Sequence, residues 1–399
     1  MSWVDLIVVV LALIAGVSGW RHGMAVALLS FVGVLGGAII GVRLAPLLAS
    51  GIESANTKII VSIVVVVVMV ALGETTGVYF GRRIRDRITG QQTLRVDSTL
   101  GSVLQALTVV IAAWLVALPL ASASFPGLAA AVRGSEVLRV VDSVMPASAR
   151  ALPEELGNLL DNSGFPQIFE SPFDRTPIEE IGPPDATLAS SPVVAEVADS
   201  VLKVRGRAPS CQRALEGTGF VIGDGLVMTN AHVVAGTDDV GVEVVNRRGR
   251  TVELNGEVVL YDPLVDIAVL RIPDLDAPTL PFRPQEAAVG EDAIVLGYPL
   301  DGAFTSTAAK VRQRITLNGP DIYDDGEVSR DVYTVRAVVR SGNSGGPMID
   351  RDGQVIGVVF GAALDDSETG FVLTNSQVAA SVNPQAQLGS EVDTGACTS

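Results

Sequence analysis

The sequence predicts two architectures in one chain: an all-α transmembrane bundle of four helices, followed by an all-β domain. Long apolar stretches are confined to residues 1–124, whereas short β-rich runs separated by turn signals fill residues 192–399. Between them, residues 125–191 hold an amphipathic segment and a proline-rich linker. A chain of 399 residues has room for this division into two or three domains.

Four apolar stretches define the N-terminal part: Leu6–Gly19, Met24–Val42, Ile59–Gly81 and Ser98–Ser124. The last three approach or exceed the ~20 residues that span a bilayer. The first is shorter, but Trp3 and Trp20 fit its two membrane interfaces. A cleaved signal peptide is the alternative for this stretch, although no Lys or Arg precedes it. The alternative for all four stretches is that they are helices buried in a protein core, and the lengths of the stretches disfavour this alternative.

Basic residues in the connections predict the orientation. The third connection carries five arginines: Arg82, Arg83, Arg85, Arg87 and Arg95. The positive-inside rule places this connection in the cytoplasm. Counting the crossings then places the N-terminus and the all-β domain outside. We therefore expect a multi-pass protein of the cell membrane with an extracytoplasmic (periplasmic) C-terminal domain.

Two features within the apolar stretches have more than one interpretation. Gly33, Gly37 and Gly41 repeat at four-residue spacing, which favours close helix packing either within the bundle or in a dimer. Glu74 lies within the third stretch, where a carboxylate is costly. It indicates a transport or sensing role, a helix-packing contact, or a protonated acid near the membrane interface.

Charge and residue clusters exclude several classes of partner. The first 123 residues carry 8 Lys/Arg and 5 Asp/Glu, and the remainder carries 20 and 39, a net charge of −19. Such an acidic domain is a poor partner for nucleic acid. No cluster has metal-ligand spacing and no glycine-rich loop has the phosphate-binding pattern. We therefore expect no cofactor and no metal.

The region before the all-β domain contains two kinds of sequence. Ser135–Arg150 has the pattern of a short amphipathic helix. Residues 153–192 are rich in proline and predict an extended tether. Such a segment is an easy substrate for proteolysis.

A candidate nucleophile lies in the stretch Gly-Asn-Ser-Gly-Gly-Pro at 342–347. A serine hydroxyl becomes reactive when a base takes its proton and donors await the oxyanion. Alone the pattern is weak, because Gly-x-Ser-x-Gly also marks α/β-hydrolases, and Gly/Ser-rich turns are common.

The position of histidine separates the two enzyme classes. The chain has only His22 and His232, and an α/β-hydrolase needs a histidine after the serine. The order His232, Asp266, Ser344 is instead that of the chymotrypsin class. A structural core histidine is the alternative for His232. Asp262 is the rival of Asp266, although the proline that follows it is typical of a turn.

Three blocks in this order resemble the signatures of trypsin-like serine proteases, closest to the HtrA branch. They are Thr-Asn-Ala-His at 229–232, Asp-Ile-Ala-Val-Leu at 266–270, and the block at 342–347. The resemblance covers residues 192–383 and implies a chymotrypsin-like fold of two six-stranded β-barrels. It implies a serine endopeptidase with His232, Asp266 and Ser344 as its catalytic residues. Because only 55 residues follow Ser344, we expect no PDZ domain of the kind that usually follows in HtrA proteases.

The N-terminal part separately resembles the colicin V production protein family. Together the two parts resemble a family of membrane-anchored acid-resistance proteases of actinobacteria. The resemblance implies cleavage of envelope proteins, with a role in acid and oxidative stress. The expected partners are protein or peptide substrates and the lipid bilayer. A transporter or secretion-type membrane protein with a regulatory protease domain is the alternative, and a non-cutting peptide scaffold is a third hypothesis.

The chymotrypsin-like geometry gives each residue a role. His232 takes the proton of Ser344, Asp266 orients the imidazole, and the backbone N–H groups of Gly342 and Ser344 form the oxyanion hole. A protonated histidine cannot act as a base, so we expect peptidase activity to fall in acid. Asn343 stands where trypsin has an acidic residue, so trypsin-style zymogen activation is not expected.

The primary specificity pocket is predicted from the alignment of the serine block. Counting back six residues from Ser344 places Val338 at its floor, with Val359 and Gly361 at the walls and Gly370 as a further candidate. None is charged, so we expect small or medium apolar residues before the scissile bond.

The two cysteines, Cys211 and Cys397, both lie in the part expected outside the membrane, where disulfides persist. Two free thiols or an interchain bond are the alternatives. A bridge closing so long a loop contributes at most roughly 5 kcal/mol, and it would link redox conditions to activity. The neighbouring tether also predicts self-cleavage, with release of the protease domain.

Overall fold

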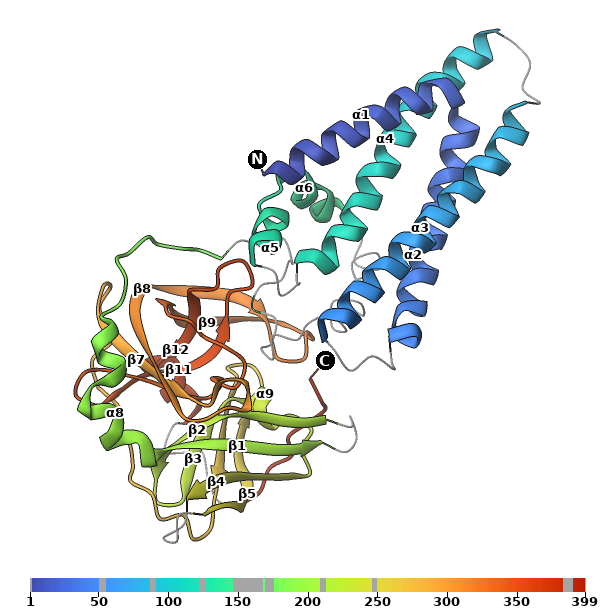
Figure 1. The fold of residues 1–399 in the computed structure, drawn as a ribbon. Helices are drawn as coiled ribbons and strands as arrows, with labels where there is room; N and C mark the ends of the chain where they lie inside the picture. Colours follow the sequence, from blue (N-terminus) through green and yellow to red (C-terminus); the bar gives the residue numbers. More distant parts are fainter. Residues whose placement is uncertain are drawn as a thin grey trace. The chain divides into compact units, whose positions relative to one another are not determined.

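The computed structural model describes residues 2–49, 55–86, 91–121, 126–145, 168, 176–208, 213–245, 250–382 and 390–398. The chain divides into two compact units, one helical and one rich in β-strands (Figure 1). The predicted architecture, a four-helix part followed along the chain by a double β-barrel, is confirmed.

Four long helices form the frame of the helical unit. They are α1 (Trp3–His22), α2 (Met24–Ala49), α3 (Ala55–Arg85) and α4 (Gln91–Ala121). Each contains a stretch long and apolar enough to cross a membrane: Trp3–His22, Met24–Ala45, Val64–Arg85 and Val96–Ala117. These stretches overlap the four predicted from hydropathy, because each helix is apolar around most of its circumference.

The glycine repeat of α2 packs against α3 within the same bundle. A Cβ atom added at Gly33 would lie 2.0 Å from the backbone oxygen of Gly73, and one at Gly37 would lie 2.2 Å from that of Met69. No side chain fits at such a distance, so glycine permits the two backbones to touch. Of the two interpretations of this repeat, packing within the bundle is the one that the structure contains. Glu74 follows Gly73 in α3 and is half-buried.

Two short helices, α5 (Pro126–Arg133) and α6 (Glu136–Val144), also belong to the helical unit, beyond residue 124, its predicted end. The carboxylate of Asp5 is fully buried and accepts hydrogen bonds from Ser135 Oγ at 2.6 Å and Val137 N at 3.1 Å. Trp114 Nε1 donates to Asp142 Oδ1 at 3.0 Å. Helix α6 is the predicted amphipathic segment in shorter form, and residues 146–150 of that prediction lie outside the described residues.

The β-rich unit contains two closed antiparallel barrels of six strands (green to yellow and orange to red in Figure 1). The first has the order β1-β2-β3-β6-β5-β4, with β1 (Val201–Ala208), β2 (Arg213–Gly223), β3 (Leu226–Thr229), β4 (Asp239–Val245), β5 (Thr251–Asp262) and β6 (Ile267–Arg271). The second repeats this order with β7 (Asp292–Gly297), β8 (Thr305–Pro320), β9 (Glu327–Arg336), β10 (Pro347–Ile349), β11 (Val355–Ala362) and β12 (Thr369–Thr374).

Short helices connect or flank these strands. They are η1 (Ala186–Ser190), α8 (Pro192–Val197), η2 (Ala198–Ser200), α9 (Ala231–Val234), η4 (Pro299–Asp301) and α10 (Asn375–Ser381). Helix α9 directly follows β3, and η4 lies in the connection between β7 and β8.

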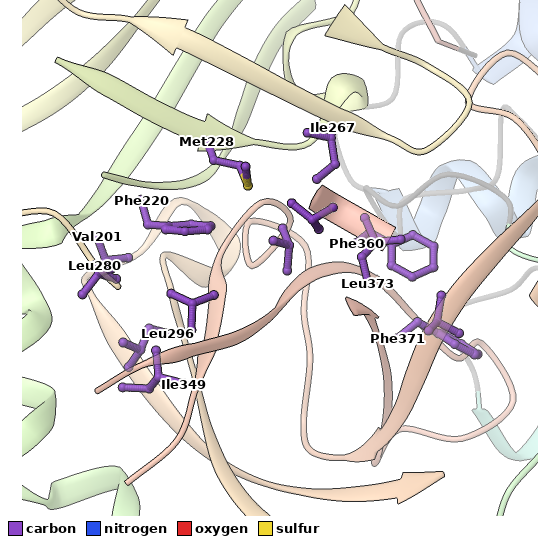
Figure 2. Packing of buried hydrophobic residues seen from close by; sticks show 14 of the residues in the cluster. Val201, Phe220, Met228, Ile267, Leu280, Leu296, Ile349, Phe360, Phe371 and Leu373 are labelled. Carbon is purple, nitrogen blue, oxygen red and sulfur yellow. The ribbon is translucent and has the colours of Figure 1, made fainter. Parts of the chain in front are cut away.

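The two barrels share a hydrophobic core. Phe220 and Met228 of the first barrel belong to the same buried cluster as Leu296, Phe360 and Phe371 of the second (Figure 2). Each barrel also has an interior cluster of its own, built mostly from valine, leucine and alanine. Burial of this shared surface holds the barrels together, because apolar area removed from water stabilises the packed state.

The second half of the predicted tether lies along the second barrel. Arg312 Nη1 donates to Glu179 O at 2.9 Å, Gln313 Nε2 to Pro177 O at 3.1 Å, and Arg336 Nη1 to Ile181 O at 2.8 Å. We call residues 176–190 the strap. The predicted tether 153–192 is therefore corrected for these residues, because side chains of β8 and β9 bind their backbone carbonyls.

The C-terminal tail, residues 390–398, lies on the first barrel. Val392 N donates to Val258 O at 2.8 Å, and Gly236 N donates to Thr394 O at 3.1 Å. Gly236 follows helix α9 by two residues, so the tail borders the segment that carries His232.

Candidate active site

His232 lies on the one-turn helix α9, where the chain leaves strand β3. Its ring Nδ1 is 2.8 Å from Asp266 Oδ2, and its backbone N–H donates to Asp266 Oδ1 at 2.9 Å. The side chain is 8% exposed, and its Nε2 has no hydrogen-bond partner among the described residues. Because Nδ1 bonds a carboxylate, the ring favours the tautomer whose Nε2 accepts a proton.

Asp266 is completely buried and directly precedes β6. Its φ of 73° lies in the left-handed region, which costs energy for a residue other than glycine. Two backbone bonds hold it there: its N–H donates to Asp262 O at 2.9 Å, and its carbonyl accepts from Asn230 Nδ2 at 2.7 Å. The strained backbone thereby aims the carboxylate at His232.

Asp262, the rival carboxylate, stabilises the turn before Asp266. Its Oδ1 accepts from Leu264 N at 3.1 Å and Val265 N at 3.0 Å, and its Oδ2 accepts from Ser381 Oγ at 2.7 Å. The structure therefore brings Asp266, and not Asp262, into contact with His232.

Ser344 comes from the second barrel, in the turn before β10. Its side chain is 1% exposed, and Oγ has no hydrogen-bond partner among the described residues. Thr218 of β2 holds the turn from the first barrel: Thr218 N donates to Ser344 O at 2.8 Å, and Thr218 Oγ1 donates to Gly342 O. On the other side Gly345 N donates to Val359 O at 2.8 Å.

The backbone N–H groups of Gly342 and Ser344 have no acceptor among the described residues. Gly342 has a φ of 89°, and a Cβ there would lie 2.3 Å from Tyr298 O. Glycine is required at this position both by its left-handed conformation and by lack of space. Two such unpaired donors near a serine hydroxyl have the chemistry of an oxyanion site.

The four predicted pocket residues take different environments. Val338 follows β9 and is 42% exposed, whereas Val359 of β11 is buried. Gly361 of β11 and Gly370 of β12 lie on adjacent paired strands. Ile168 packs over Gly361, where an added Cβ would come within 2.3 Å of its Cδ1. Their assignment to a specificity pocket stays a prediction.

A buried arginine places positive charge near the Asp266 carboxylate. Arg330 of β9 is 3% exposed, and its Nε donates to Leu264 O at 2.9 Å. Burial lowers the pKa of the Arg330 guanidinium, against the opposing effect of Asp266 and two other carboxylates. Arginine remains protonated despite this, so it contributes a fixed positive charge that interacts with the Asp266 carboxylate.

Sequence patterns did not identify Thr218, Asn230 or Arg330 as part of this arrangement. Asn230 lies within the Thr-Asn-Ala-His block and was detectable by position alone. Thr218 and Arg330 lie in strands with no motif, so no signal in the sequence distinguished them. Among the described residues, no group of three or more His, Cys, Asp or Glu is arranged to hold a metal ion.

Cys397 lies in the C-terminal tail and is disulfide-bonded. Its backbone and Sγ lie within about 3 Å of where a Cβ on Gly236 would be, in the turn that follows α9. Cys211 lies outside the described residues, so its pairing with Cys397 stays a prediction.

The double barrel, the contact between His232 and Asp266, and the turn that carries Ser344 are those of a trypsin-like serine protease. Residues 217–358 match the model of the trypsin-like peptidase domain, and residues 4–146 match that of the colicin V production protein. The serine protease Rv3671c of Mycobacterium tuberculosis is 48% identical over 402 residues, covering 100% of this chain and 99% of that one. This chain belongs to the same family of serine proteases.

Two further comparisons agree with this assignment. The crystal structure of the Rv3671c protease in its active form has a TM-score of 0.53 and 52% identity, covering 57% of this chain and 99% of that chain. A probable DegP-like periplasmic serine endoprotease of Hahella chejuensis is 33% identical over 144 residues, 36% of this chain and 29% of that one.

Proposed function

We propose that this chain is a membrane-tethered endopeptidase whose protease unit faces the extracytoplasmic side and cleaves proteins of the cell envelope. Four helices able to cross a membrane support the tether. The arginines at the end of α3 support the orientation, because basic connections stay in the cytoplasm. The observation that carries the proposal is the 2.8 Å contact from His232 Nδ1 to Asp266, with Nε2 left available as a base.

The catalytic steps follow from these positions. Ser344 Oγ attacks the peptide carbonyl while His232 Nε2 takes its proton, and the N–H groups of Gly342 and Ser344 stabilise the oxyanion. His232 then donates the proton to the leaving amine, which gives an acyl-enzyme. Water attacks the acyl group with His232 again as the base. Asp266 stabilises the imidazolium in both steps.

Labelling by a fluorophosphonate tests the nucleophile. The full chain in detergent should be labelled on Ser344, and Ser344→Ala should remain unlabelled with the same melting temperature. An unlabelled wild-type chain that is folded, or equal labelling of Ser344→Ala, would disprove the assignment.

The residues predicted for the specificity pocket are uncharged, and we therefore propose cleavage after small or medium apolar residues. They are Val338, Val359, Gly361 and Gly370. A library of peptides that vary at the position before the scissile bond measures this preference. Preferential cleavage after Lys, Arg, Asp or Glu would contradict it.

We extend the proposal to self-cleavage on the N-terminal side of Thr176. The strap begins there, and its backbone is engaged by Arg312, Gln313 and Arg336, which hinders its entry into an active site. The wild-type chain should release a fragment that starts before Thr176, and Ser344→Ala should stay full length. The same fragment from Ser344→Ala would assign the cut to another protease.

A role in acid and oxidative stress completes the proposal. A disulfide at Cys397 next to the segment that carries His232 supports a link to oxidising conditions. Protonation of His232 should nevertheless slow peptide cleavage in acid. In a deletion strain, the wild-type chain but not Ser344→Ala should restore survival under acid or peroxide. Full rescue by Ser344→Ala would shift the function to the helical unit.

A further inference from the structure

The connection that follows β7 contains two consecutive residues with left-handed backbone. Leu300 and Asp301 both have a φ of 56°. Non-glycine residues adopt this region at a cost, and they remain there when surrounding contacts hold them. Leu300 is 65% exposed, so packing of its side chain does not explain the conformation.

The backbone of this connection binds the turn that carries the proposed oxyanion hole. Leu300 N donates to Ser341 O at 2.7 Å. In a trans peptide the C=O and N–H bonds point in opposite directions. A bond to the Ser341 carbonyl therefore turns the N–H of Gly342 away from Leu300, which leaves that N–H free to meet an oxyanion.

Two cations of the first barrel hold the connection in place. Lys203 Nζ donates to both Asp301 Oδ1 at 2.7 Å and Asp301 O at 2.9 Å. Arg205 Nη2 donates to Asp301 Oδ1 at 2.9 Å. Tyr298 OH, at the start of the connection, donates to Val201 O at 3.1 Å. All these partners lie on β1, so one strand of the first barrel anchors the connection of the second.

We propose that Asp301 is a positioning residue: its bonds with Lys203 and Arg205 hold Leu300 N–H against Ser341 and so orient the N–H of Gly342 toward the oxyanion. This inference rests on the proposed roles of Gly342 and Ser344. Asp301 touches no reacting atom, and its effect is therefore confined to stabilisation of the transition state.

The variant Asp301→Asn tests the inference in the full chain. Asparagine tolerates the left-handed backbone as well as aspartate does, so the change removes the charge and leaves the turn. Losing one oxyanion donor costs about 10²- to 10³-fold in kcat, and a misaligned donor should cost roughly tenfold, with KM within about twofold. Affinity for a peptide boronic acid, which forms a tetrahedral adduct with the serine, should fall by a similar factor, while product-peptide affinity stays unchanged.

Two further variants test whether the effect comes from the contact between Asp301 and Lys203. Lys203→Met should reproduce the loss of kcat, and combining it with Asp301→Asn should add little, because both remove the same contact. Asp239→Asn is the matched control, because it removes an ion pair with Arg207, which lies on β1 like Lys203 and Arg205. The Asp239 side chain is 42% exposed, against 43% for Asp301. Its kcat should equal that of the wild type.

The outcomes separate this inference from the proposed function. Rates are referred to folded, labelled active sites, so partial unfolding does not mimic the effect. If Asp301→Asn keeps kcat and boronate affinity within about twofold of wild type, or loses product-peptide affinity equally, the positioning role is wrong. A wild-type chain that is not labelled on Ser344 would instead overturn the proposed function.

Discussion

The two barrels have the same strand order but hold their candidate catalytic groups by different means. In the first barrel, one side chain positions the histidine: the Asp266 carboxylate accepts both the ring Nδ1–H and the backbone N–H of His232. In the second, the backbone positions Ser344, through its own carbonyl and the N–H of Gly345. Loss of function should therefore follow from side-chain chemistry in the first barrel and from backbone geometry in the second.

The largest effect is expected from Asp266→Asn in the first barrel. An amide favours the wrong imidazole tautomer and does not stabilise imidazolium, so kcat should fall about 10⁴-fold. Asp262→Asn is the matched control, because Asp262 accepts bonds within its turn and does not contact His232. Steady-state rates measure both. Similar losses in the two variants would show that the site depends on the turn and not on the carboxylate beside the histidine.

Gly342→Ala is the corresponding change in the second barrel. Its Cβ would meet Tyr298 O at 2.3 Å, and φ is 89°, so the peptide must rotate away from its present position. We expect kcat to fall about 10²-fold, as for loss of an oxyanion donor. In Gly326→Ala the nearest atom is 3.7 Å away, so kcat should not change. If Gly342→Ala keeps the kcat of the wild type, backbone geometry at this position does not control catalysis, and the proposed difference between the barrels is wrong.

A smaller effect is expected where the strap lies on the second barrel. Arg312 is 3% exposed, and Arg312→Met removes its bond to Glu179 O. A hydrogen bond to a charged group contributes about 2 kcal/mol, so the strap should open more often. In the Ser344→Ala background, added thermolysin should cut the strap faster in Arg312→Met than in Gln313→Met, which removes an exposed bond. Equal rates would mean that the buried arginine does not hold the strap.

The smallest effect concerns acid stability. The bond from Arg314 holds the pKa of the Asp331 carboxyl below its usual value, with further bonds from Thr374 and Ser376. A lowered folded-state pKa contributes stability above the unfolded value of about 3.9, and this is lost as pH falls through the folded value. Asp331→Asn should therefore cost on the order of 1 kcal/mol at neutral pH.

Urea unfolding of the wild type and Asp331→Asn across pH measures this contribution. The difference between them should begin to narrow below about pH 4, where the unfolded state of the wild type takes up the proton, and should be smallest below the lower pKa of the folded state. A difference that is constant across pH would assign the effect of Asp331 to packing.

The sequence was sufficient for the parts that depend on local pattern. Apolar stretches of bilayer length predicted the four long helices. The order of three short blocks singled out His232 and Asp266, which the structure brings into contact, and Ser344 as the candidate nucleophile. The preference for Asp266 over Asp262 also followed from the chain, because a proline after Asp262 indicates a turn. These features can be predicted because they depend on residues close together in the sequence, or on a set of residue types that a single reaction mechanism requires.

Contacts between distant parts of the chain explain the features that local patterns did not predict. Proline content predicted a free tether, but side chains of β8 and β9, more than 130 residues further along the chain, bind residues 177–181. The glycines of α2 allowed two kinds of packing, and contact with α3 selected one.

Thr218, Arg330 and Asp301 belong to no motif, and each forms its hydrogen bonds with partners that only folding brings close. The order of histidine, aspartate and serine along the chain was enough to name the candidate catalytic groups, because a serine nucleophile requires a base and an orienting carboxylate. Only the closed barrels decided which residues hold those groups in place, because that support depends on backbone directions and distances between strands far apart in the chain.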